Sequence, residues 1–193
     1  MKKEEYLSVL SNANDGAITY YVGDNEEDVK HLTNCTLLCK ESFSPKLQKV
    51  QLIKSKDPQL EFYKLSNKYK KKYLEESELE FIDGYYLHKD AVIGKNVSIG
   101  KGCVIGKCKI SDNVIIHPNV VVYAETEIKS DVLIQANTVI GAEGIMWVWD
   151  DEERVYLHQL GGVVIEKHCK IGSNVTIVRG SANENTIIGE GTC

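Results

Sequence analysis

Residues 87–140 decide the fold, and their sequence is LHKDAVIGKNVSIGKGCVIGKCKISDNVIIHPNVVVYAETEIKSDVLIQANTVI. One aliphatic residue recurs there at nearly every sixth position, and eight of the nine intervals between these residues are six residues long. We call them the marks: Leu87, Ile93, Ile99, Ile105, Ile110, Ile116, Val122, Ile128, Ile134 and Ile140. Neither an α-helix nor a single strand has this period, whereas short strands joined by tight corners do. Three such sides make a coil of roughly 18 residues, with neighbouring coils about 4.8 Å apart.

Two further patterns repeat in step with the marks. Small or β-branched residues form a second ladder, two residues before the marks: Ala91, Val97, Cys103, Cys108, Val114, Val120, Thr126, Val132 and Thr138. Three residues after the marks stand types that tolerate positive φ, namely Asn96, Gly102, Asn113, Asn119, Asp131 and Asn137, with Glu125 as the exception. Sharp corners require that backbone conformation. The agreement of these patterns predicts a parallel β-helix of the hexapeptide type.

The repeat is interrupted twice. It stops after Ile140 and resumes at Ile165, so residues 141–162 are expected to loop out of the coil. This loop carries Trp147 and Trp149. Two tryptophans on such a loop need a surface that buries them, so a contact with another subunit is the favoured explanation. A second interruption follows Ile177, and the repeat restarts before Cys193 without a capping element. Because the end of a β-helix is normally capped, we expect an incomplete C-terminal end or a partner that covers it.

The chain is predicted to hold two domains. Residues 1–82 lack the six-residue period and read as a small α/β domain, and residues 83–193 form the β-helix with the loop insertion 141–162. The fold class is therefore mainly β. In the first domain we expect strands at 18–22, 36–39 and 50–53 and helices at 4–10, 26–32 and 58–72. Asp57 is the expected N-cap of the last helix, with Pro58 at its first position.

Composition excludes several classes of function. The net charge of −5 gives no reason to expect binding to nucleic acid or to acidic membranes. No apolar run approaches the roughly 18 residues of a membrane span, and the N-terminal sequence MKKEE lacks the apolar core of a signal peptide. We therefore expect a cytoplasmic protein without a membrane span.

The cysteines are expected to be buried thiols. Cys103, Cys108 and Cys169 occupy the small-residue ladder, and Cys35 and Cys39 belong to an apolar strand. The sequence contains no CxxC pair, and its histidines lack the spacing of a three-histidine zinc site, so neither a metal site nor a zinc hydratase is expected. The state of Cys193, the last residue, stays open.

Tyr20 and Asn25 are candidate substrate-binding residues. An exposed aromatic side chain beside a turn that carries Asn25 can stack a nucleobase and bond its edge. Strand alternation turns either Tyr20 or Tyr21 inward, so core packing is the alternative explanation for one of the two.

Four motifs in the β-helix point to a known family. They are Gly141-Ala-Glu-Gly144, Gln159-Leu-Gly-Gly-Val-Val-Ile165, Ile171-Gly172 and Thr176-Ile-Val-Arg-Gly180. In these motifs and their order around the loop, the chain resembles the LpxD-type UDP-3-O-acylglucosamine N-acyltransferases and related nucleotide-sugar N-acyltransferases. The resemblance extends to the first domain through Gly16-Ala-Ile-Thr-Tyr20, His31-Leu32 and Asp57-Pro58.

The resemblance implies a fold, an activity and partners. It implies a left-handed β-helix, homotrimers with active sites between subunits, and a first domain that binds uridine, where Tyr20 matches the stacking aromatic. A histidine would act as general base on the amine of a nucleotide-linked amino sugar. That amine would attack an acyl thioester on acyl carrier protein or coenzyme A, as in lipid A or surface glycan biosynthesis, without a bound cofactor.

The family's histidine segment would begin after Cys193, so another histidine is needed if this chain is active. His158, on the loop beside Gln159, is the one placed where a cleft is plausible, and a loop hydrogen bond is the alternative. His88 and His117 are expected to face solvent, and His168 occupies a corner position. The alternative functions are a non-catalytic nucleotide-sugar-binding or scaffold trimer, or a truncated inactive fragment of the enzyme.

Overall fold

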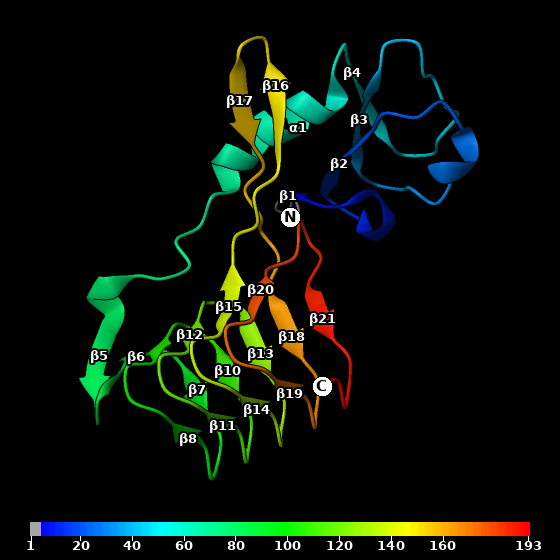
Figure 1. Ribbon diagram of the computed structural model, residues 1–193. Helices are drawn as coiled ribbons and strands as arrows, with labels where there is room; N and C mark the ends of the chain where they lie inside the picture. Colours follow the sequence, from blue (N-terminus) through cyan, green and yellow to red (C-terminus); the bar gives the residue numbers. More distant parts are fainter. Residues whose placement is uncertain (1–4) are drawn as a thin grey trace. The chain divides into compact units, whose positions relative to one another are not determined.

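The computed structural model describes residues 5–193, and its secondary structure is mainly β (Figure 1). The described chain forms two compact units. The first contains residues 5–70, Ile145–Leu160 and Ser181–Glu184; the second contains Lys71–Gly144, Gly161–Gly180 and Asn185–Cys193. This division differs from the expected boundary after residue 82. The segment from Lys71 onward belongs to the second unit, where Ala124 N donates to Tyr73 O at 3.0 Å.

Three parallel sheets form the second unit. The first has the order β21 (Thr186–Ile188), β18 (Val163–Ile165), β13 (Thr126–Ile128), β10 (Lys109–Ile110) and β7 (Val92–Ile93). The second has the order β19 (Lys170–Ile171), β14 (Leu133–Ile134), β11 (Ile115–Ile116) and β8 (Ser98–Ile99). The third has the order β20 (Thr176–Val178), β15 (Val139–Ala142), β12 (Val121–Val122), β9 (Val104–Ile105), β6 (Tyr85–His88) and β5 (Leu79–Ile82).

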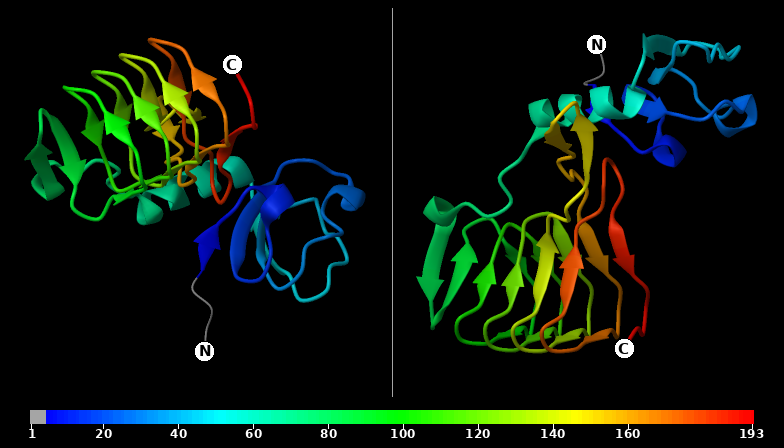
Figure 2. Two further views of the ribbon diagram at one scale, coloured as in Figure 1. Left: turned by 90° about the horizontal axis from the view of Figure 1, so that it is seen from below. Right: turned by 45° about the horizontal axis from the view of Figure 1, so that its top comes forward.

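The chain passes through the three sheets in turn, so the second unit is a three-sided coil. Figure 2 shows the strands of successive coils stacked side by side and running in the same direction. Only β5 and β6 pair antiparallel within the described second unit, as a hairpin at the first coil. This is the arrangement of a parallel β-helix. The left hand of the coil, which the resemblance implies, stays a prediction.

The marks stack in columns, as predicted. Ile110 pairs with Ile93 on one side and with Ile128 on the other. The single five-residue interval shortens one coil without disturbing this register: Val121 pairs with Val104, 17 residues before it, and with Val139, 18 residues after it. The missing residue is therefore taken from a corner and not from a strand.

The corners adopt the predicted left-handed conformation. The φ angles are 55° at Asn96, 59° at Asn113, 60° at Asp131 and 62° at Asn137. Glu125, the exception in the sequence, has the same conformation with a φ of 61°. Position in the coil therefore decides the backbone conformation, and Glu125 carries the steric cost of a β-carbon there.

The core of the second unit consists of the stacked marks and the second ladder. Ile105, Ile116, Ile128, Ile134 and Ile140 are at most 1% exposed. Five of the six cysteines are buried free thiols, as predicted, and Cys193 is exposed. Burial raises the pKa of the Cys108 thiol to about 12, so this side chain behaves as a small apolar residue.

The first unit contains a four-stranded parallel sheet with the order β1 (Tyr6–Leu7), β2 (Ala17–Tyr21), β3 (Thr36–Lys40) and β4 (Gln51–Ser55). Alternation along the strands creates two clusters. Ala17, Leu37 and Cys39 pack with Val29 and Phe43 on one face. On the other face, Ile18 and Leu38 pack with Phe62 and Tyr63 of helix α1 (Pro58–Ser66). Asp57 caps this helix as predicted, because its Oδ1 accepts from Leu60 N at 2.9 Å.

Two predicted helices of the first unit are wrong and one is too long. The segment expected to be helical at 4–10 contains strand β1, paired with β2, and the 3₁₀ helix η1 begins only at Leu10 (Leu10–Asn12); residue 4 lies outside the described residues. The segment 26–32 contains only the 3₁₀ helix η2 (Glu26–Asp28). Helix α1 ends at Ser66 and passes through η3 (Asn67–Tyr69), because the like charges at Lys68 and Lys70 to Lys72 disfavour its continuation.

The loop expected to leave the coil is a β-hairpin that belongs to the first unit. Strands β16 (Trp147–Asp150) and β17 (Glu153–Tyr156) pair antiparallel. Val148 and Val155 pack against the cluster of Phe62 and Tyr63, and Lys64 of α1 forms a 2.8 Å ion pair with Asp150. The outward face carries Trp147 and Trp149, which are 38% and 52% exposed.

No helix within residues 5–193 has the length and apolar character that crossing a membrane requires.

Candidate functional site

Tyr20 lies at the end of β2 and packs on helix α1. Its ring centroid is 4.9 Å from that of Phe62, and the rings are tilted by 44°. Partial burial, with a smaller contribution from Tyr63, raises the pKa of the Tyr20 hydroxyl. Core packing, the alternative weighed for one of the two tyrosines, therefore accounts for much of this ring.

Asn25 is bonded to Tyr21 and not to Tyr20. The Tyr21 hydroxyl donates to Asp28 Oδ2 at 2.6 Å. The backbone N–H of Asn25 donates to the hydroxyl oxygen of Tyr21 at 3.3 Å. The side chain of Asn25 caps η2, because its Oδ1 accepts from Glu27 N at 3.2 Å. Tyr20 and Tyr21 point to opposite faces of the sheet, so Asn25 contacts the tyrosine on the face opposite to Tyr20.

His158 follows the hairpin and is held by the end of helix α1. Its Nε2 lies 2.9 Å from Asn67 Oδ1, and its backbone N–H donates to Ser66 Oγ at 3.1 Å. The side chain is half-buried. These contacts anchor the returning strand of the loop to α1, which is the alternative that the sequence left open for His158.

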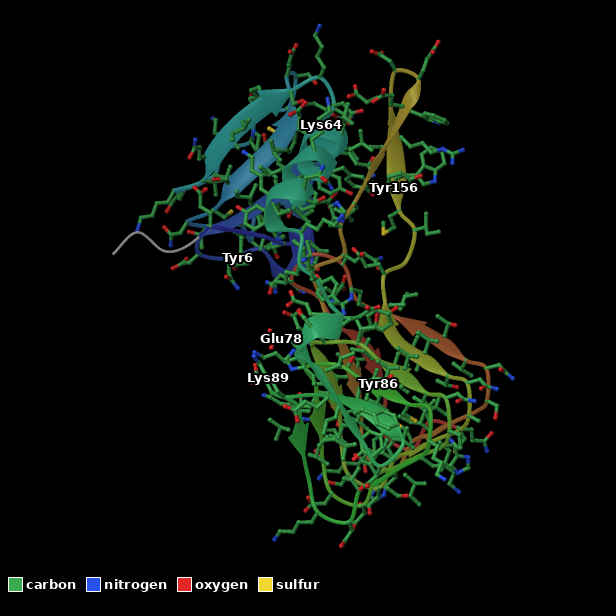
Figure 3. All side chains as sticks on the ribbon, turned by 90° about the vertical axis from the view of Figure 1, so that its left-hand side faces the viewer. Tyr6, Lys64, Glu78, Tyr86, Lys89 and Tyr156 are labelled. Atoms are coloured by element: carbon green, nitrogen blue, oxygen red, sulfur yellow. The ribbon has the colours of Figure 1, made fainter. Side chains whose placement is uncertain are left out.

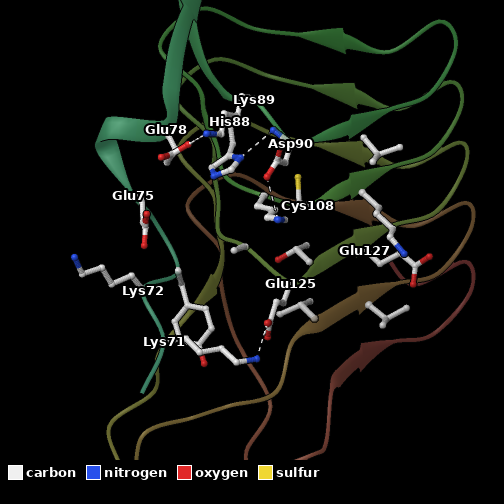
Figure 4. A pocket seen from close by; sticks show the side chains of 18 of the residues that line it. Lys71, Lys72, Glu75, Glu78, His88, Lys89, Asp90, Cys108, Glu125 and Glu127 are labelled. Atoms are coloured by element: carbon white, nitrogen blue, oxygen red, sulfur yellow. Dashed lines mark hydrogen bonds and ion pairs between the residues drawn. The ribbon is translucent and has the colours of Figure 1, made fainter. Parts of the chain in front are cut away.

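A pocket of about 750 Å³ lies within the second unit (Figure 4). The covering segment, residues 71–78, forms one side of it. Strands β7, β10, β13 and β18 of the first sheet form the other side, together with the turn at His88 to Asp90. Its volume is in the range of small-molecule sites. None of the candidate residues from the sequence lines this pocket.

Ion pairs surround the pocket. Lys71 Nζ lies 2.7 Å from Glu125 Oε1, and Lys107 Nζ lies 3.0 Å from Asp90 Oδ2. Lys89 pairs with Glu78, and these two side chains point toward one another in Figure 3. The ammonium group of Lys107 lowers the pKa of Asp90, and the carboxylate of Glu78 raises the pKa of Lys89.

His88 is the histidine that lines this pocket. It is 9% exposed, and its Nδ1 accepts the backbone N–H of Asp90 at 3.0 Å. The expectation that His88 faces solvent is therefore wrong, because the covering segment and the β5–β6 hairpin enclose the first coil. No local sequence signal distinguished His88 from His117, which also follows a mark and is exposed.

Arg179 supports one wall of the pocket from behind. It is 1% exposed and donates to Ala124 O at 2.9 Å, while its guanidinium stacks on the ring of Tyr73. Ala124 and Tyr73 both line the pocket. Arg179 thus ties the covering segment to a corner of the coil.

Within the described part of the chain, no group of three or more histidine, cysteine, aspartate or glutamate side chains is arranged to hold a metal ion.

Comparison with known proteins identifies the repeat. Residues 107–142 match the sequence profile of a family described as Bacterial transferase hexapeptide (six repeats). The matched residues run from the end of the first complete coil through β15, within the second unit. No significant match to a curated protein is found. The match supports the broad class of hexapeptide-repeat transferases and an activity of the acyltransferase or acetyltransferase type.

Proposed function

We propose that this protein is an N-acyltransferase that acts on a nucleotide-linked amino sugar. The acyl group comes from a thioester of acyl carrier protein or coenzyme A, and the protein works as a cytoplasmic homotrimer of left-handed coils. The observation that carries the proposal is the hexapeptide transferase match on a stacked, three-sided parallel coil. The motifs around the loop, Gly141 to Gly144 and Gln159 to Ile165, favour the nucleotide-sugar branch of this class.

The reaction forms one bond and breaks another. The amine nitrogen attacks the thioester carbonyl carbon and gives a tetrahedral oxyanion. A general base takes the proton that the nitrogen loses, and collapse of the oxyanion breaks the carbon–sulfur bond and releases the thiol. The protein must therefore supply a base within hydrogen-bond reach of the amine and donors for the oxyanion.

His158 is the proposed base, and Tyr20 and Asn25 are the proposed nucleotide contacts. The Asn67 oxygen at 2.9 Å from His158 Nε2 can hold the ring in one orientation, as a base requires. Tyr20 offers the part of its ring that Phe62 leaves uncovered. Asn25 lies after the end of β2, as the N-cap of η2. These assignments rest on the resemblance and on the loop position of His158.

An acyl-transfer assay tests the reaction. The protein, produced from its native coding sequence, is incubated with UDP-linked amino sugars and acyl thioesters of several chain lengths, and mass spectrometry follows the products. The expected result is a nucleotide sugar heavier by one acyl group, formed together with free thiol. Absence of this product from every combination of donor and acceptor would overturn the proposal.

Two substitutions separate catalysis by His158 from loop anchoring. His158→Ala removes both the proposed base and its side-chain contact with Asn67, whereas Asn67→Ala keeps the base and removes the partner of Nε2 together with the bond from Asn67 Nδ2 to Lys64 O. If His158 is the base, His158→Ala should lower kcat by about 100-fold or more, and Asn67→Ala should keep most of it. Equal losses of kcat in both variants would show that His158 only anchors the loop and is not the base.

A second candidate function is a non-catalytic nucleotide-sugar-binding trimer. The contacts of His158 with Asn67 and Ser66 favour it, because they give this histidine a structural reason to be present. Calorimetric titration with UDP-linked amino sugars distinguishes the two functions. Binding without product in the assay above supports the second, and product formation rules it out.

A further inference from the structure

We propose that the pocket of the second unit binds a small organic anion, whose phosphate or carboxylate group accepts a hydrogen bond from His88 Nε2. This binding does not depend on the proposed acyl transfer and can be measured without an acyl donor. The inference rests on the tautomer of His88, on the place of its ring in the pocket lining, on the charges that remain unpaired around it and on the apolar surface beside it.

The backbone fixes the tautomer of His88. Asp90 N–H donates to Nδ1 at 3.0 Å, so Nδ1 must present its lone pair. A neutral imidazole carries one proton, which is then on Nε2. His88 therefore offers a hydrogen-bond donor at Nε2, and a ligand group that approaches it must be an acceptor.

This donor opens into the pocket, while most of the His88 side chain is covered by protein. The side chain is 9% exposed, and Nε2 forms no hydrogen bond with any residue in the range 5–193. Figure 4 shows the ring of His88 with one nitrogen toward Asp90 and the other toward the space beneath the covering segment. Nε2 is not among the fully enclosed polar atoms that lack a partner, so it meets the solvent of the pocket. A ligand that displaces this solvent must offer Nε2 an acceptor.

The remaining charges favour an anion. Glu78, Asp90, Glu125 and Glu127 are neutralised by Lys89, Lys107, Lys71 and Lys129, each in an ion pair. Among the lining residues, Lys72, Lys109 and Glu75 make no ion pair with any other described residue. The lining holds five lysines and five carboxylates, and Glu127 pairs with Lys129, which lies outside the lining. Two ammonium groups, Lys72 and Lys109, therefore remain for one carboxylate, Glu75, which leaves one positive charge for an anion to neutralise.

The size and surface of the pocket require an organic body on that anion. A volume of about 750 Å³ is far larger than a phosphate or carboxylate group alone. Val92 and Val164 of the first sheet and the ring of Tyr73 form its apolar surface. A ligand with an apolar or ring-shaped body and one anionic end matches both parts of the pocket.

Calorimetric titration with three matched probes tests the ligand class. Phenyl phosphate and phenylacetate carry the same ring with different anions, and benzyl alcohol is their neutral counterpart. We expect at least one anion to bind about tenfold or more tightly than benzyl alcohol, the ratio typical of a hydrogen bond to a charged group. The tighter of the two anions identifies phosphate or carboxylate as the natural group. Binding of neither anion, or equal binding of all three probes, would overturn the proposal.

Two substitutions at His88 test the role of Nε2. His88→Asn places an oxygen where Nδ1 accepts the Asp90 N–H and removes the donor at Nε2, whereas His88→Gln keeps an N–H group near the position of Nε2. The first variant should bind the preferred anion about tenfold more weakly and keep the thermal midpoint of the wild type. The second should retain more of the affinity. Unchanged affinity in a folded His88→Asn variant would contradict the proposal.

A pair of lysine variants keeps the test decisive if the His88 variants are unstable. Lys109 and Lys170 are both exposed and both stand directly before a buried isoleucine, in β10 and β19 respectively. Lys109 lines the pocket and Lys170 does not. Lys109→Gln should weaken anion binding severalfold, and Lys170→Gln should leave it unchanged. Equal effects would show that the anions bind to general surface charge only.

Discussion

The guanidinium carbon of Arg179 lies 3.2 Å from the centroid of the Tyr73 ring. The same side chain donates to Gly141 O at 2.8 Å and Gly161 O at 3.1 Å, at the two ends of the excursion from the coil, and to Ala124 O at 2.9 Å. Burial lowers the pKa of Arg179, and the hydroxyl of Tyr73 acts in the opposite direction. Arg179 therefore closes the coil where the chain leaves it and returns.

Replacing Arg179 should destabilise the second unit strongly. Arg179→Met keeps much of the volume and removes the donor from three carbonyl oxygens, in two buried bonds and one partly buried bond. We therefore expect a loss of about 3 kcal/mol or more in the free energy of unfolding. Urea unfolding measures this loss. Arg154→Met is the control: Arg154 stacks on Trp147 at 4.6 Å on an exposed surface, and its loss should cost about 0.5–1 kcal/mol. Equal losses in both variants would contradict the structural role of Arg179.

The coil could be predicted from sequence because the period of six recurs over many turns. The stacking of Ile93, Ile110 and Ile128 follows from that period, and even the one short interval keeps the register. The corner conformation at Asn96 and Asn137 follows from residue type. Glu125 shows that position in a repeat decides the conformation where residue type alone would not.

The pocket could not be predicted in the same way. His88 and His117 follow marks in the same manner, yet one is buried and the other exposed. The difference arises because the covering segment 71–78 and the β5–β6 hairpin, which lie outside the repeat, enclose the coil at His88. The separation of Tyr20 from Asn25 was likewise invisible, because alternation shows that neighbouring tyrosines diverge but not which of them meets the turn. Local patterns specify repeats, whereas sites depend on contacts between segments.

The corner at Asn137 should tolerate glycine better than alanine. Its φ is 62°, a conformation that costs an alanine side chain about 1 kcal/mol and costs glycine almost nothing. We expect Asn137→Ala to lose about 1 kcal/mol in unfolding free energy and Asn137→Gly to stay within about 0.5 kcal/mol of the wild type. Urea denaturation of both variants measures the difference. A glycine variant as unstable as the alanine variant would show that the Asn side chain, and not φ, matters here.

The thiols should react in two classes. Five cysteines are buried and Cys193 is exposed, so iodoacetamide at pH 8 should modify one thiol per folded chain and all six after denaturation in urea. Peptide mass spectrometry should locate the first modification at Cys193. In the variant Cys193→Ser, no thiol should react under folding conditions; rapid labelling of a second cysteine would show that the coil opens.

Cys108 should make the protein less stable as the pH rises above about 8.5. Its thiol has a pKa of about 12 in the folded chain, against about 8.5 for an exposed cysteine. Between these values the unfolded chain loses this proton and the folded chain keeps it, so the contribution is complete below about pH 8.5 and decreases by about 1.4 kcal/mol per pH unit above it. Cys108→Val removes the titrating group and keeps a small apolar side chain.

The difference in unfolding free energy between wild type and Cys108→Val, measured in urea from pH 7 to pH 10.5, should therefore shift steadily in favour of the variant. Cys193→Val, at a position exposed in both states, should run parallel to the wild type. Parallel curves for Cys108→Val as well would mean that this thiol meets water in the folded chain.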